Sequence, residues 1–98
     1  MDHILKKMTG ERERLQYLLK TMENEIAQYP EGFLSYKNTR GIMRPYHVYY
    51  DRTHKKIETY LSKKDATRME ILLRKKFIKA SLVIINRRIQ WLDDSIKD

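Results

Sequence analysis

The chain has 98 residues, of which 21 are Lys or Arg and 13 are Asp or Glu, so its formal net charge is +8. Its length predicts one small domain over residues 1–98 with a thin core, because a chain of this size buries only about 65% of its unfolded surface. The absence of cysteine excludes disulfides and thiolate metal sites. No apolar stretch is long enough for a signal peptide or a membrane span, which predicts a soluble protein of the cytoplasm.

The positive charge is concentrated in the middle of the chain. Residues 37–79 carry thirteen Lys or Arg against four Asp or Glu, a net of +9, whereas residues 1–36 have a net of −1 and residues 80–98 a net of zero. A solvated basic face is one explanation. A concentrated basic surface is also what binding to a phosphate backbone requires, because cations release the counterions of nucleic acid.

The first predicted element is a helix over residues 1–29. Its apolar residues recur at spacings of three, four and seven, which form one buried stripe. Gly10 weakens the first turns, so the secure part of the helix begins near Glu11. Pro30 and Gly32 end the helix. Because the charges of this segment nearly cancel, we expect it to serve packing.

Residues 33–61 change to a period of two and are rich in β-branched and aromatic side chains, which predicts three strands. Short connections between successive strands predict an antiparallel meander. The strands are expected at residues 33–37, 46–51 and 56–61. Pro45 is expected at the start of its strand or on an edge, because it has no backbone N–H to donate.

The second strand has two different faces. We expect Tyr46, Val48 and Tyr50 to face the helix. This choice leaves His47 and Tyr49 on the open face of the sheet.

A long helix is predicted over residues 62–97. Ser62 and Asp65 resemble a capping box, and no Gly or Pro follows. Two apolar stripes run along this segment. One consists of Met69, Leu73, Phe77, Ala80 and Ile84, and the other of Ile71, Ile78, Leu82, Ile85, Ile89, Leu92 and Ile96. We expect its first half to cover the sheet and its second half to pair with the first helix, which gives an α+β fold.

The sequence contains no catalytic constellation. His47 and His54 are seven residues apart across a predicted turn, which is not a metal-ligand spacing. Only Asp51 and Glu58 can approach each other, too few carboxylates to hold Mg²⁺. There is no Gly-rich loop that would cradle phosphate. We therefore expect no enzymatic activity, no metal and no cofactor.

Basic and aromatic residues of the middle segment form the candidate site. Cationic side chains bind phosphate oxygens, whereas flat side chains stack on bases. We predict contacts with nucleic acid, either DNA or RNA, through Lys37, Arg40, Arg44, His47, Tyr49, Arg52, Lys55, Lys56, Lys63, Lys64, Arg68 and Lys75.

Three stretches, YPEGFLSYKN, PYHVYYD and ETYLSKKDATRMEILLRKKFI, together resemble a domain of uncharacterised proteins from Firmicutes and their phages. The resemblance implies a protein of a bacterial host cytoplasm, encoded by a phage or mobile element. Some relatives continue into a restriction-endonuclease-like domain, which this sequence does not contain, so nuclease activity is not implied. The predicted meander and helix are also distantly similar to the DNA-binding domains of tyrosine recombinases and plant ethylene-response factors, whose sheet enters the major groove.

Three functions are compatible with these features. The first is a nucleic-acid-binding module. The second is an anti-CRISPR-like phage inhibitor that binds a host ribonucleoprotein through its nucleic acid. The third is a non-catalytic assembly protein that forms a homodimer through the apolar stripes of the long helix. None of the three involves a membrane.

Overall fold

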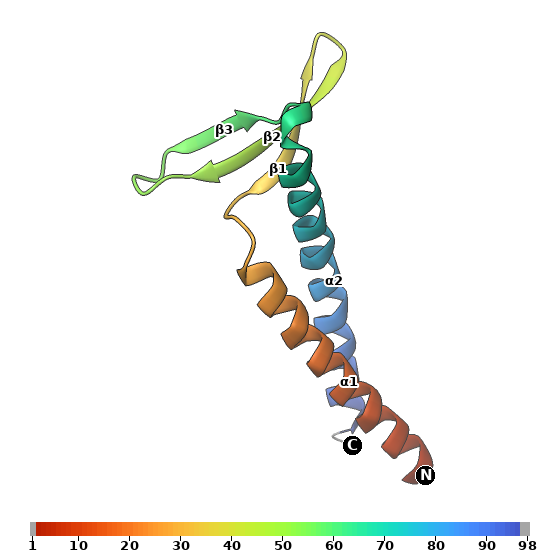
Figure 1. The fold of residues 1–98 in the computed structure, drawn as a ribbon. Coiled ribbons are helices and arrows are strands. Elements are labelled where there is room, and N and C mark those ends of the chain that lie inside the picture. Colours follow the sequence, from red (N-terminus) through yellow and green to blue (C-terminus); the bar gives the residue numbers. More distant parts are fainter. Residues whose placement is uncertain (1, 97–98) are drawn as a thin grey trace. The chain divides into compact units, whose positions relative to one another are not determined.

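The computed structural model describes residues 2–96, with the side chains of residues 3–96. The elements are α1 (Asp2–Ala27), β1 (Phe33–Thr39), β2 (Ile42–Tyr50), β3 (Lys56–Tyr60), a short 3-10 helix (Lys63–Asp65) and α2 (Ala66–Ile96) (Figure 1). This order confirms the predicted α+β fold. The predicted helix ends at Met1 and Lys97 lie outside the described residues. Neither of the two described α-helices is long and apolar enough to cross a membrane.

The chain packs as two compact units. One comprises Met1–Gln28 and Ile78–Asp98 and is called the helical unit below; the other comprises Tyr29–Phe77 and is called the sheet unit. The first half of α2 belongs to the sheet unit, and its second half belongs to the helical unit. The organisation of the whole chain as a single domain stays a prediction.

In the helical unit, α1 and the second half of α2 lie side by side and run in opposite directions (Figure 1). Ion pairs join Arg12 to Asp93 and Arg88 to Glu11. The hydrogen bonds that Arg88 donates to Glu11 lower the pKa of this carboxyl. The predicted pairing of the two helices is confirmed.

The two predicted apolar stripes of α2 differ in burial. In the second stripe, Ile78, Ile85 and Leu92 are buried, as predicted for an internal face of this helix. In the first stripe, the prediction of a packed face is wrong for Leu73, Phe77, Ala80 and Ile84, which are exposed. Met69 is the member of this stripe that packs as predicted, beside Leu72, in a cluster with Leu34 and Leu61. Leu72 lies one position before Leu73, so the covered side of the helix is rotated by one residue from the predicted one.

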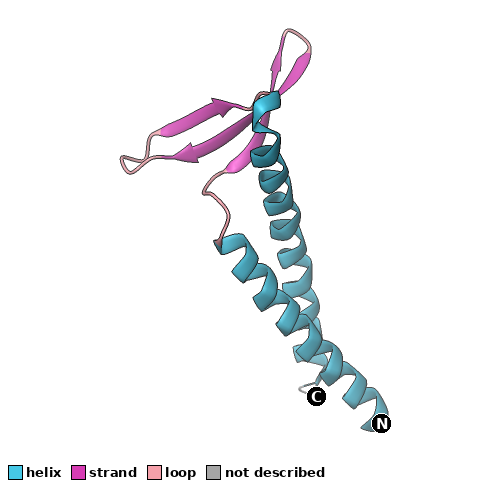
Figure 2. Cartoon of the chain, in the orientation of Figure 1, coloured by secondary structure: helices cyan, strands magenta, loops and turns pink. Residues whose placement is uncertain are grey.

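The sheet has the strand order β1-β2-β3 and is antiparallel throughout (Figure 2). The β1–β2 hairpin turns over two residues, Arg40 and Gly41, whose φ values are 53° and 83°. Two positive φ values are typical of a type I′ turn, which matches the twist of the flanking strands. The turn is therefore shorter than the predicted one, and β2 begins at Ile42 instead of Tyr46.

Pro45 lies inside the central strand β2, yet it occupies a local edge. Its carbonyl accepts a hydrogen bond of 3.0 Å from the amide of Leu61. Because N and C=O of one strand residue point to the same side, the Pro45 nitrogen also faces the β3 side, where the strand has ended at Tyr60. Only half of a ladder pair forms here, because Pro45 has no N–H to donate back to Leu61, and proline is tolerated because the pairing with β3 ends at this point. The prediction of a strand start or an edge strand is wrong, since β2 begins at Ile42 and is the central strand.

Alternation of side chains along the strands gives the sheet two faces. The helix-side face carries Leu34, whose cross-strand partner is His47, and Leu34 packs with Leu72 of α2. The opposite face is called the open face. Strand alternation and register place Phe33, Ser35, Lys37, Arg44, Tyr46, Val48, Tyr50, Lys56, Glu58 and Tyr60 on the open face.

Two aspartates build the connections of the sheet unit. Asp51 accepts hydrogen bonds from the Thr53 hydroxyl and from the amides of Thr53 and Lys55, and these bonds lower its pKa. Asp65 accepts from the amide of Ser62, which lowers the pKa of Asp65, and completes the capping box predicted from the sequence. These acids hold backbone groups, not the surface cations beside them in sequence.

The lowered pKa values predict that stability falls in acid. A carboxyl whose pKa is lower in the folded state stabilises the fold above its unfolded pKa of about 3.9, and this contribution disappears as the pH falls through the folded value. We expect the urea midpoint to fall below about pH 4 in the wild type, and to fall less steeply in Asp51→Asn. Glu23→Gln, at an exposed position of α1, is the control and should leave the steepness unchanged. Equal steepness in all three proteins would contradict the role of Asp51.

Candidate functional site

Cations and aromatic rings alternate on the open face. The Lys37 ammonium lies 4.8 Å from the centroid of the Tyr46 ring, and the Arg44 guanidinium lies 5.9 Å from that of Tyr60. The two rings are 5.6 Å apart and tilted by 59°. Such distances are in the range of cation–π and aromatic contacts, which orient the side chains while leaving part of each ring accessible. Tyr60 retains 45% of its exposure.

The charges of the open face are only partly compensated. Lys37 and Lys56 both form ion pairs with Glu58, an acid of β3. Within the part of the chain that the structure describes, Arg40 and Arg44 have no carboxylate partner. Two positive groups therefore stay available to an external anion.

One cross-strand pair on this face is unfavourable. Lys37 of β1 stands directly opposite Arg44 of β2. Like charges at opposite positions of an antiparallel pair are destabilising. The sequence therefore departs from the choice that stability favours at a surface position, which is expected where a residue serves binding.

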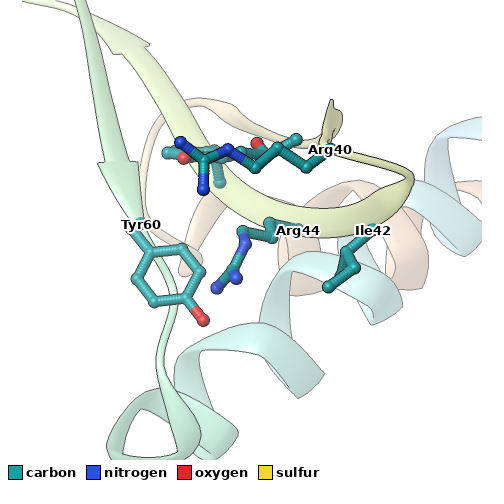
Figure 3. Close-up of a pocket in the computed structure, with 6 residues that line it drawn as sticks. Arg40, Ile42, Arg44 and Tyr60 are labelled. Carbon is teal, nitrogen blue, oxygen red and sulfur yellow. The ribbon is translucent and has the colours of Figure 1, made fainter.

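A hollow of about 640 Å³ lies on the open face beside the β1–β2 hairpin. It is lined by Thr39, Arg40, Ile42, Arg44, Tyr46 and Tyr60. Figure 3 shows Arg44 directed toward the Tyr60 side chain, with Ile42 on its other side and Arg40 near the turn. Its volume lies in the range of small-molecule sites, roughly 300–1,000 Å³.

The prediction that His47 lies on the open face is wrong. Its side chain is 6% exposed, and its Nε2 donates a hydrogen bond of 2.7 Å to the carbonyl of Glu31. Tyr49, two residues along the same strand, is on the helix-side face too, and its ring centroid lies 5.2 Å from that of His47. The physical reason is that the Tyr29–Gly32 segment passes over β2, where the backbone carbonyl of Glu31 needs a hydrogen-bond donor and the His47 ring supplies it.

Lys75 also has a structural contact that its charge did not predict. Its ammonium donates hydrogen bonds of 2.9 Å and 2.8 Å to the carbonyls of Pro30 and Gly32. The half-buried side chain therefore holds the turn before β1, and the interpretation of Lys75 as a phosphate contact is corrected. The sequence signal was its position, three residues after Leu72 and three before Ile78, on the covered side of the helix.

The remaining predicted residues are exposed, except the half-buried Arg44, and they occupy different places. Arg52 and Lys55 lie in the β2–β3 turn, and Lys63 and Lys64 in the 3-10 helix. Arg68 lies on α2 and helps to line a hollow of about 320 Å³. The other residues around that hollow are Pro30, Glu31, His47, Tyr49 and Thr59. The structure therefore brings together Lys37, Arg40, Arg44 and Lys56, but separates Arg68 and Tyr49 from them on the helix side.

Tyr46 and Tyr60 are the site residues that the strand pattern assigned to the wrong face or left out. Tyr46 lies two residues after Arg44 in β2, so both side chains are on the same face of the sheet. Tyr60 of β3 stands directly opposite Tyr46 and therefore shares that face. For Tyr46, the basic residue Arg44 two positions earlier was the available signal; Tyr60 has Glu58 and Ser62 at that spacing and carried no such signal. Among the described residues, no three His, Asp or Glu side chains lie close enough together to hold a metal ion.

No family model, no curated protein sequence and no solved structure matches this chain. The resemblances noted in the sequence stay predictions. The class of site follows from its chemistry, which is that of a basic and aromatic sheet face with a hollow beside the β1–β2 hairpin.

Proposed function

We propose that this protein binds nucleic acid through the open face of its sheet, in a binding role and not a catalytic one. The observation that carries the proposal is the combination of Arg44 without an acidic partner and two tyrosine rings beside it. Guanidinium groups bind phosphate, and tyrosine rings stack on bases. A partner that offers both groups at short spacing is a polynucleotide.

The distribution of charge between the two units supports the same partner. The sheet unit contains twelve Lys or Arg and five Asp or Glu, whereas the helical unit contains nine and eight. Three of the five acids, Asp51, Glu58 and Asp65, are engaged with backbone groups or lysines. The excess of the sheet unit is therefore directed at solvent, where it attracts polyanions.

The turns extend the basic surface beyond the open face. Arg40 is at the tip of the β1–β2 hairpin, and Arg52 and Lys55 are in the β2–β3 turn. Exposed cations on turns contact phosphates without reading bases, because they reach the backbone first. We place this activity in the cytoplasm of a bacterial host.

The proposal predicts binding that weakens steeply with salt. Electrophoretic shifts with duplex DNA, single strands and structured RNA, repeated at several salt concentrations, should show complexes at low salt. On single strands, the slope of log K against log salt should be about −0.7 for each phosphate neutralised. Lys56→Glu should weaken the complex, whereas Lys6→Glu, an exposed position of α1 with the same change of charge, should not. A lack of any complex at low salt would overturn the proposal.

A further inference from the structure

Two aromatic side chains of the open face, Tyr46 and Tyr60, line the hollow beside the β1–β2 hairpin. The ring centroids of these two tyrosines are 5.6 Å apart, and Arg44 is directed toward Tyr60 (Figure 3). The two rings are tilted by 59°, so they cannot stack on each other face to face. Tyr60 is 45% exposed, so part of its ring is accessible to a third flat group.

This shape discriminates between forms of nucleic acid. A duplex offers only the edges of its bases in the grooves, because both faces of each base are stacked on neighbours. Side chains that read a duplex must project into the groove. An unpaired base offers its whole π-face and can enter a recess, where it stacks on an aromatic ring or a guanidinium plane.

The lining of the hollow matches a nucleotide in its other groups. Ile42 is apolar and 56% exposed, and can contact a base or sugar edge. Arg40 and Arg44 also line the hollow and supply positive charge that suits the flanking phosphates of a nucleotide. No carboxylate lines the hollow, so its walls do not repel a phosphate.

We propose that the preferred ligand is single-stranded nucleic acid, and that the hollow takes one unpaired base stacked on Tyr60, with Arg40 and Arg44 on the flanking phosphates. This inference rests on the proposed function and narrows it to one form of nucleic acid at the same site. Stacking is tolerant of base identity, so we expect little sequence specificity.

Fluorescence anisotropy with a labelled single strand of about 12 nucleotides, and with its duplex, tests the inference. The single strand should bind at least several times more tightly than the duplex at the same salt. Tyr60→Ala should weaken single-strand binding by roughly tenfold, because stacking on one base is lost, whereas Tyr60→Phe should keep the wild-type affinity. Tyr17→Ala, which removes a 76% exposed tyrosine of α1, is the matched control and should have no effect.

The outcomes separate this inference from the proposed function. Equal or tighter binding of the duplex would overturn the preference for single strands and leave nucleic-acid binding standing. Tight single-strand binding that Tyr60→Ala does not change would overturn the assignment of the hollow. A lack of binding to either form would overturn both. Thermal melting of each variant confirms that a loss of binding is not a loss of folding. If Tyr60→Ala does not fold, Tyr60→Leu keeps an apolar side chain in the strand but removes the flat ring, and unchanged single-strand binding by this variant would overturn the assignment.

Discussion

Arg44→Glu is expected to lower the affinity for single-stranded nucleic acid by roughly tenfold or more at low salt, because a phosphate contact is replaced by repulsion. Arg44 has no carboxylate partner among the described residues and lies over the Tyr60 ring, so it is already oriented toward the open face. The slope of log K against log salt should become shallower by about 0.7, which corresponds to one phosphate.

The same substitution should leave the fold intact or stabilise it. Glutamate at position 44 stands opposite Lys37, and an opposite-charge pair across two strands is worth roughly 0.2–1 kcal/mol. Binding and stability should therefore change in opposite directions, which a misfolded variant cannot do. Lys6→Glu provides the control for net charge, and Arg44→Lys should recover most of the affinity. An Arg44→Glu protein that binds like the wild type would remove this residue from the site.

Gly32→Ala is expected to lower the free energy of unfolding by about 2–4 kcal/mol, more than an added methyl group at either of the other two glycines. Gly32 has a φ of +98°, and a Cβ at this position would lie 2.3 Å from the carbonyl oxygen of Val48. The same Cβ would lie 2.9 Å from His47 Nε2, the atom that bonds to Glu31. Relief of the clash must move the turn that Lys75 and His47 hold.

Two other glycines separate the causes of this effect. Gly41→Ala meets open space at a φ of +83°, so it should cost only about 1 kcal/mol for the positive φ. Gly10→Ala lies inside α1 with open space around it, and should stabilise the protein by roughly 0.5–1 kcal/mol. Urea unfolding of the three variants measures all of these values. If Gly32→Ala lowered the free energy of unfolding by no more than Gly41→Ala does, the close approach of the turn to β2 would not contribute to the effect.

The order of elements could be predicted because each carries a local signal. The period of two between Phe33 and Leu61, the stop at Pro30–Gly32 and the capping box at Ser62 and Asp65 are all short-range features, and the structure has an element boundary near each. The hairpin turn at Arg40 and Gly41 was expected within a longer turn, since glycine alone does not fix which residues pair.

The assignment of faces could not be predicted in the same way. Alternation in β2 separates His47 and Tyr49 from Tyr46 and Val48, but does not say which set a helix covers. Val48 is buried on the open face, between its cross-strand partners Phe33 and Glu58. Its apolar character therefore does not identify the face that the helix covers. His47 is buried because a backbone carbonyl from a distant turn requires a donor. The alternation of residues along a strand cannot predict such a contact.

The sequence therefore predicted which basic residues belong to the candidate site, but not how they are arranged. Lys37, Arg40, Arg44 and Lys56 follow from the excess of positive charge in the middle of the chain. Their grouping with the two tyrosine rings depends on the register of three strands, which only the structure provides.

The central claim, that the open face of the sheet is the contact surface, is tested most directly by amide chemical shifts of the isotope-labelled protein during titration with a short single-stranded oligonucleotide. We predict that the largest shifts fall on β1, β2 and β3 around Arg44, Tyr46 and Tyr60, and that α1 is unaffected. Shifts concentrated in α1 or in residues 78–96 of α2 would contradict this assignment.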